Sequence, residues 1–168
     1  MNKLQFFRTL IITYGIMLLS GCQADERRIR DIVREEFSQL MQRSVITDVN
    51  VIGPYSPAQR VGNFLFASGQ IALNQETGQL ENRDIETETR RVLDNLMVIL
   101  RKAGFDSSDV VSTTVYLKDM ANYSKMNTIY GGYFQDGNYP ARVTVQVAAL
   151  PRDANIEISA IAYKPEKD

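Results

Sequence analysis

A chain of 168 residues is long enough for one globular domain with an appendage, and its 44% hydrophobic and 23% charged residues are ordinary proportions for a folded domain. The formal charge of -1 is nearly balanced and no basic stripe with interleaved aromatic residues is present, which argues against a nucleic-acid partner. Histidine is absent and Cys22 is the only cysteine, which excludes Ser-His triads, Cys-His pairs and the usual zinc ligand sets. Any chemistry must therefore use Arg, Tyr, Ser, carboxylates, the backbone and water.

The amino-terminal residues have the order of a bacterial secretion signal. Lys3 and Arg8 precede an almost wholly apolar stretch at residues 9–19. This stretch is shorter than the ~20 residues that cross a bilayer, so a permanent transmembrane helix is the weaker alternative. The following Leu-Ser-Gly-Cys, which ends at Cys22, resembles the lipobox of bacterial lipoproteins, in which the cysteine is lipid-modified. We expect a signal peptide over residues 1–21 and an exported protein, not a cytosolic one, anchored to a membrane through Cys22.

A charged segment at residues 25–41 has one apolar face. Its apolar residues recur at helical spacing: Ile29, Ile32, Val33, Phe37, Leu40 and Met41. This helix can pack on its own domain, join the equivalent helices of neighbouring subunits, or act as a spacer from the membrane. We favour packing on the domain, because Glu36 interrupts the heptad pattern of a coiled coil. We assign residues 22–47 to a lipid-anchored linker with this helix and residues 48–168 to the domain.

Within the domain, the sequence pattern predicts two helices and several strands. The turn Val61-Gly62-Asn63 indicates a hairpin that leads into a buried strand. Asp84 can cap a helix that ends at Gly104, and a second helix has the apolar stripe Met126, Ile129, Tyr130, Tyr133 and Phe134. Further strands are expected at 110–117, 141–150 and 156–164. This order predicts an α+β fold in which both helices pack on one face of a mixed sheet.

Arg142 stands directly after Pro140-Ala141, at the expected start of a strand. Such a position can hold a side chain rigidly, and the planar guanidinium can bind a carboxylate through two parallel hydrogen bonds. An exposed arginine paired with a surface acid is the simpler alternative, and on spacing alone it is the more common arrangement.

Five segments resemble signatures of the RidA family of imine deaminases, in the family's order and spacing. They are G-P-Y-S-P-A at 53–58, A-S-G-Q-I at 67–71, T-T-V-Y-L-K-D-M at 113–120, P-A-R-V-T-V-Q-V-A-A-L-P at 140–151 and I-E-I-S-A-I-A at 156–162. One such segment would be weak support for a relationship. Five in register span the domain from residue 53 to residue 164.

The resemblance implies a chorismate-mutase-like α+β fold and a homotrimer with each active site between two subunits. Family members hydrolyse reactive enamines and imines, such as 2-aminoacrylate, to a 2-keto acid and ammonia without a cofactor or a metal. The resemblance also implies that Arg142 binds the substrate carboxylate and that Glu157 activates the attacking water. Tyr55 would line the pocket, and Ser68 and Gly69 would form a loop beside it.

Asn127 in the second helix and Tyr139 beside Pro140 are lesser candidates for substrate binding. Simpler structural roles exist for the other site residues as well, since Glu157 can face solvent, Tyr55 can cover the core, and Ser68-Gly69 can make a tight bend. An exported protein lies away from the cytosolic enzymes that release 2-aminoacrylate. A module that binds small carboxylates or keto acids without turnover is therefore the main alternative, and a structural trimer is a third.

Overall fold

The computed structural model describes residues 23–47, 49–134 and 137–165, which belong to two separate compact units. One unit contains the helix α2 (Gln23–Leu40), and the other extends from Arg43 to Lys164. The expected signal peptide and the expected lipidation site, Cys22, lie outside the described residues. Among the described helices, none has the length and apolar character that a membrane span requires.

The amphipathic helix predicted at residues 25–41 is present as α2, with slightly different ends. Arg30 and Glu26, which are one turn apart, form an ion pair with a 3.3 Å separation between Nη2 and Oε2. The apolar side chains of Ile32, Val33 and Phe37 are exposed. Because the two units are described separately, packing of this face on the domain stays a prediction.

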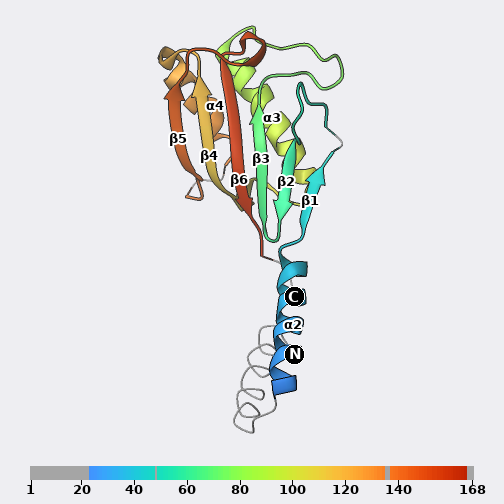
Figure 1. Cartoon of the computed structure of the whole chain (residues 1–168). Coiled ribbons are helices and arrows are strands. Elements are labelled where there is room, and N and C mark those ends of the chain that lie inside the picture. Colours follow the sequence, from blue (N-terminus) through green and yellow to red (C-terminus); the bar gives the residue numbers. More distant parts are fainter. Residues whose placement is uncertain (1–22, 48, 135–136, 166–168) are drawn as a thin grey trace. The chain divides into compact units, whose positions relative to one another are not determined.

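Within the described residues, six strands form one mixed sheet (Figure 1). In the sheet order β1-β2-β3-β6-β4-β5 they are Arg43–Ile46, Ala58–Val61, Phe64–Gln70, Ile156–Tyr163, Val110–Leu117 and Ala141–Gln146. Neighbouring strands are antiparallel except β4 and β5, which are parallel. β1 lies in the segment 22–47 that we assigned to the linker, so the sheet begins before the predicted domain boundary at residue 48.

The predicted hairpin connects β2 to β3 through Gly62 and Asn63. Gly62 has a φ of 55°, a left-handed conformation that costs little without a Cβ. The two carboxy-terminal strands are also present, although β5 ends at Gln146 instead of continuing to residue 150. A 3₁₀ turn at Pro151–Asp153 leads from there towards β6.

Local signals fix the ends of helix α3 (Ile85–Lys102) where the sequence predicts them. Asp84 accepts a hydrogen bond from the backbone N–H of Thr87 (2.7 Å), and acidic residues in the first turn complement the helix dipole. Gly104, with a φ of 80°, follows the last turn. The buried stripe includes Val92 and Leu96. This helix covers the middle of the sheet.

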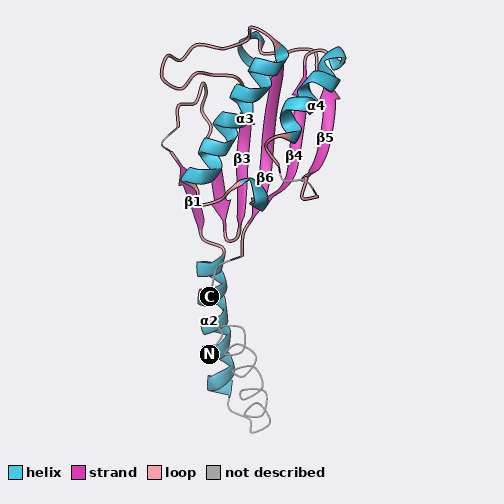
Figure 2. Cartoon of the chain, turned by 180° about the vertical axis from the view of Figure 1, so that it is seen from behind, coloured by secondary structure: helices cyan, strands magenta, loops and turns pink. Residues whose placement is uncertain are grey.

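Helix α4 (Tyr123–Gly131) begins before the predicted apolar stripe and ends before Phe134. A 3₁₀ turn at Met120–Asn122, capped by Asp119, leads into it and explains the earlier start. Met126 and Tyr130 form its buried face. As predicted, α3 and α4 lie on the same face of the sheet (Figure 2).

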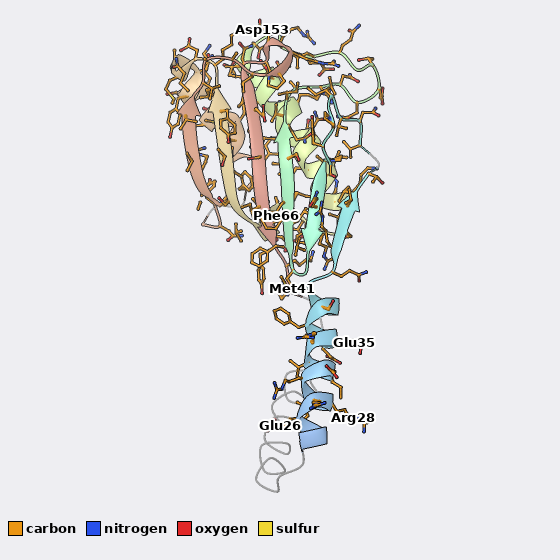
Figure 3. All side chains as sticks on the ribbon, viewed as in Figure 1. Glu26, Arg28, Glu35, Met41, Phe66 and Asp153 are labelled. Atoms are coloured by element: carbon orange, nitrogen blue, oxygen red, sulfur yellow. The ribbon has the colours of Figure 1, made fainter. Side chains whose placement is uncertain are left out.

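The alternation of side chains gives the sheet a covered face and an open face. On β3, Leu65 is fully buried beneath the helices, whereas its neighbour Phe66, labelled in Figure 3, is 46% exposed on the open face. Further large apolar residues of the open face are exposed as well: Phe64, Val143, Val145, Ile161 and Tyr163. The fold therefore presents an apolar sheet face on which another chain can pack.

Candidate functional site

Arg142 is the second residue of β5, and its side chain points to the covered face of the sheet. It is in register with Thr113 of β4, which is buried and shares a hydrogen bond of 2.6 Å with the Tyr130 hydroxyl of α4. The guanidinium carbon lies 4.5 Å from the centroid of the Tyr130 ring and 5.8 Å from that of Tyr123. Nη2 also donates a hydrogen bond to the Tyr123 hydroxyl (3.3 Å). These contacts orient the cation without neutralising its charge.

Arg142 borders a hollow of ≈ 320 Å³ that we call the arginine hollow. Its lining residues are Asn127, Tyr130, Gly131, Tyr139, Pro140 and Arg142. Among the described residues, Arg142 has no ion-pair partner, so the simpler arrangement of an arginine paired with a surface acid is not seen there. A cation fixed between aromatic rings at the edge of a hollow suits the binding of a small carboxylate.

Thr144 lies two residues after Arg142 on β5, on the same face. Its Oγ1 is buried and, alone among the buried side-chain polar atoms of the described ranges, has no hydrogen-bond partner. Such an unpaired group costs about 1–3 kcal/mol unless a ligand, a water or another chain provides a partner. The covered side of β5 therefore contains, besides Arg142, a polar group that the folded chain leaves unsatisfied.

Glu157 is the second residue of β6 and lies on the open face, in register with Tyr116 of β4. It is half-buried, and this burial raises the pKa of its carboxyl above the usual value of 4.5. No ion pair with a described residue offsets the desolvation. No group of three or more potential metal-ligating side chains occurs in the described ranges. A carboxyl with a raised pKa is suited to accept and return a proton.

Gly69 of β3 lies directly against the Glu157 carboxylate. An ideal Cβ on residue 69 would be 1.8 Å from Oε1 of Glu157, so the close approach requires a glycine. The sheet register shifts between Ala67 and Gln70, and in this bulge the Ser68 hydroxyl donates a hydrogen bond to the carbonyl of Ser56 (2.7 Å). The bulge thus holds Ser68 and Gly69 in a fixed conformation next to Glu157.

Tyr55 joins Gly69 at a second, smaller hollow of ≈ 20 Å³. Its side chain is 43% exposed, so it does not cover the core as the simpler explanation requires. We call Tyr55, Ser68, Gly69 and Glu157 the Glu157 cluster.

The arginine hollow and the Glu157 cluster lie on opposite faces of the sheet. Arg142 is in register with Thr113 of β4, whereas Glu157 is in register with Tyr116. Residues three positions apart on a strand point to opposite sides, because successive side chains alternate between the faces. One chain therefore does not bring Arg142 and Glu157 together, and the predicted site residues form two half-sites.

A fully buried carboxylate on α3 fixes the beginning of β6. Both oxygens of Glu88 accept hydrogen bonds from Asn155, one from its backbone N–H (2.7 Å) and one from its side-chain Nδ2 (2.8 Å). Asn155 directly precedes the strand that contains Glu157. Glu88 is therefore a structural support of the Glu157 cluster that the sequence reasoning missed.

Tyr123 is the other missed residue, although the sequence reasoning included Asn127. The two are four positions apart on α4 and share one face of the helix. The four-residue spacing from Asn127, together with the short distance in sequence between α4 and β5, is the signal that could have indicated Tyr123 as a neighbour of Arg142. The predicted candidates Asn127 and Tyr139 both line the arginine hollow.

Comparisons with known proteins extend over most of the sheet-forming unit. The family model described as endoribonuclease L-PSP matches residues 45–164. A RutC family protein of Pyrococcus horikoshii is 52% identical over 113 residues, which are 67% of this chain and 89% of that protein. The 2-iminobutanoate/2-iminopropanoate deaminase of Mus musculus is 48% identical over 113 residues, 67% of this chain and 83% of that enzyme.

Solved structures agree with the fold described above. The YjgF gene product of E. coli has a TM-score of 0.68 at 38% identity and covers 72% of this chain and 98% of its own. E. coli TdcF with bound serine also has a TM-score of 0.68, at 34% identity, with coverage of 72% of this chain and 98% of its own.

Proposed function

Because this chain belongs to the RidA/YjgF family, we propose that it hydrolyses 2-imino acids and their enamine tautomers to 2-keto acids and ammonia. The observation that carries the proposal is the stacked guanidinium of Arg142, which has no described ion-pair partner and borders an open hollow. A 2-imino acid carries a carboxylate, which this guanidinium can bind through two charge-assisted hydrogen bonds of roughly 1.5–3 kcal/mol each. The activity named for the mouse relative supports the same reaction.

The proposed active site combines the two half-sites across a subunit boundary. Members of the family are typically trimeric, and we propose a homotrimer here. The exposed apolar residues of the open sheet face, Phe66 and Val143 among them, would be buried in such an assembly. β5 is an edge strand, so its Arg142 lies at the border of the sheet, where it can meet the Glu157 cluster of a neighbouring subunit.

The reaction uses only groups of the chain and a water molecule. Glu157 accepts a proton from the water as its oxygen bonds to the imine carbon, and the Tyr55 hydroxyl donates a proton to the imine nitrogen. In the resulting tetrahedral carbinolamine, Glu157 returns its proton to the amine nitrogen, the C–N bond breaks to release ammonia, and the C=O bond of the keto acid forms as the hydroxyl proton restores Tyr55. One water is consumed for each ammonia released. The imine carbon is already electrophilic and needs little activation. The contribution of Arg142 is therefore to orient the substrate for attack by the water.

The protein's location is a separate proposal. We propose that lipid on Cys22 anchors it to a membrane on the exported side, on the basis of the charged, apolar and small residues that precede this cysteine. Changing Cys22 to Ala should move the protein from the membrane fraction to the soluble fraction. Retention of that variant in the membrane would contradict the anchor.

Capture of a small carboxylate without turnover is the second candidate function. One observation favours it: the arginine hollow lies on the face of the sheet away from Glu157. The likeness to E. coli TdcF with bound serine is compatible with such a site.

A coupled assay distinguishes the two functions. An amino-acid oxidase generates 2-imino acids, and keto-acid release is followed with the wild type, Arg142→Ala and Glu157→Gln, with Arg101→Ala at the exposed end of α3 as a control. A deaminase accelerates release, and both site variants abolish the acceleration. A binding module gives no acceleration, and 2-oxobutanoate binding is lost in Arg142→Ala alone. Lack of acceleration by the wild type would contradict the enzymatic function.

A further inference from the structure

Tyr123 is placed to contact any ligand that binds Arg142. It is the first residue of α4 and is 39% exposed, and its hydroxyl lies 3.3 Å from Nη2 of Arg142. Its ring also faces the guanidinium, with 5.8 Å between the ring centroid and the guanidinium carbon. Neither the motifs nor the mechanism above give this residue a role.

The oxygen of Tyr123 accepts a hydrogen bond from Arg142. Arg142 can only donate, so the contact at 3.3 Å uses one lone pair of the hydroxyl oxygen. A side-chain hydrogen bond with Asn127, together with the charge of Arg142, lowers the pKa of Tyr123 below its usual value of 10.0. A hydroxyl has two acceptor sites and one proton to donate. The bond from Arg142 uses an acceptor site of the hydroxyl and not its proton, so it leaves the phenolic proton for a ligand.

Tyr130, the other tyrosine beside Arg142, is arranged differently. Its hydroxyl is only 2.6 Å from the hydroxyl of Thr113, inside the protein, and burial raises its pKa. Tyr130 therefore contacts Arg142 from the protein interior, whereas Tyr123 is exposed at the surface.

We propose that Tyr123 is a further ligand-binding residue, which donates a hydrogen bond to the carboxylate held by Arg142 and so increases the preference for anionic ligands. This inference rests on the proposed function, since it requires that the arginine hollow binds a carboxylate. Arg142 at the edge of the hollow then provides its guanidinium donors, and the adjacent Tyr123 provides one phenolic donor to the same group.

A phenolic donor makes ligand binding sensitive to alkaline pH. When Tyr123 loses its proton, it no longer donates, and its negative charge beside Arg142 repels a carboxylate. The neighbouring groups do not mask this titration. Tyr130 titrates above its usual pKa, the turn Met120–Asn122 contains no charged residue, and Asp119 at the cap of this turn accepts a hydrogen bond from the backbone N–H of Ala121. Lys125 of α4 lies 3.8 Å from Glu86 of α3 and is directed there.

The test measures 2-oxobutanoate binding to the full chain by calorimetry between about pH 7 and about pH 10.5. We expect Tyr123→Phe to weaken binding about tenfold at neutral pH. Wild-type affinity should fall at alkaline pH, whereas the affinity of Tyr123→Phe should stay level in that range. The neutral amide of the same acid should lose less affinity in Tyr123→Phe than the acid does, because its carbonyl accepts a weaker hydrogen bond than a carboxylate.

Tyr133→Phe is the matched control. The Tyr133 hydroxyl donates to Asp94 (2.7 Å) on α3 and lies outside the arginine hollow, so this variant should keep the wild-type pH curve. A parallel loss of affinity in Tyr123→Phe at every pH would mean that Tyr123 only positions Arg142, and it would overturn the inference.

Turnover measurements separate this inference from the proposed function. Imine hydrolysis by the wild type, with unchanged 2-oxobutanoate binding in Tyr123→Phe, would overturn the inference alone. Binding that depends on Tyr123 in a protein without turnover would support the inference and contradict the deaminase. A wild type that binds no 2-oxobutanoate would overturn both.

Discussion

The carboxylate of Glu157 occupies the space that any side chain on Gly69 would need. An ideal Cβ on residue 69 would lie 1.8 Å from Oε1, 2.7 Å from Cδ and 2.9 Å from Cγ of Glu157. The clashing atoms are the outer part of a flexible side chain, not backbone. A substitution at residue 69 therefore moves the carboxylate more readily than it disturbs the sheet.

Gly69→Ala is expected to reduce imine hydrolysis at least about tenfold and to lower the free energy of unfolding by less than about 1 kcal/mol. Keto-acid release and urea denaturation measure the two effects separately. Gly132→Ala is the control, because a Cβ there meets only the Ile129 carbonyl at 3.5 Å, and it should change neither quantity. A large loss of stability in Gly69→Ala with unchanged turnover would contradict the proposed role of Glu157.

The raised pKa of Glu157 predicts a specific dependence of stability on pH. Burial favours the neutral carboxyl of Glu157 in the folded chain, so the pKa of this carboxyl is higher in the folded than in the unfolded chain, where it is near 4.5. The contribution of the neutral carboxyl to folding stability is therefore fully present below the unfolded pKa. It is lost as the pH rises through the folded pKa. Glu157→Gln stays neutral throughout. Its melting temperature should therefore rise relative to the wild type as the pH increases through this range. A difference in melting temperature that does not change with pH would disagree with the raised pKa.

Glu88→Gln should destabilise the fold by about 1–3 kcal/mol. A glutamine has one acceptor oxygen for the two donor groups of Asn155, so its own NH₂ group would face the second of these donors. Chemical denaturation provides the measurement. Turnover should fall as well, since Asn155 precedes the strand of Glu157. Glu86→Gln, whose carboxylate pairs with Lys125 at the surface, should change stability by less than about 1 kcal/mol. Equal effects of the two substitutions would refute the role of the buried contact.

Thr144→Val should leave the free energy of unfolding unchanged or raise it by up to about 1 kcal/mol, because it removes a buried hydroxyl that has no described partner. Thr144→Ser, which retains the hydroxyl, provides the comparison and should lose stability with its methyl group. The two variants are compared by urea denaturation. If Thr144→Val proves less stable than Thr144→Ser, the hydroxyl has a partner in the assembled protein.

Local signals explain which elements the sequence predicts well. Asp84 and Gly104 mark the two ends of α3 by cap chemistry that acts within a few residues. Four-residue β1, Arg43–Ile46, was missed because so short a segment has no clear alternation, and its strand conformation depends on pairing with β2. Local capping is visible in a sequence, whereas pairing at a sheet edge is not.

The candidate site shows the same limit. The family resemblance predicts that Arg142 and Glu157 are site residues, but whether they share a face depends on the register of β5 and β6 against β4. That register is a property of the assembled sheet. Tyr123 was missed for a related reason, since its contact with Arg142 joins a helix to a strand that follows it in the chain.

The separation of Arg142 and Glu157 on opposite sheet faces also has a genetic consequence. An Arg142→Ala subunit retains Glu157, and a Glu157→Gln subunit retains Arg142. If each site takes these residues from different subunits, equal amounts of the two inactive proteins would assemble randomly into trimers with about a quarter of their sites intact. Two alleles that are each inactive alone would then complement one another in the same cell.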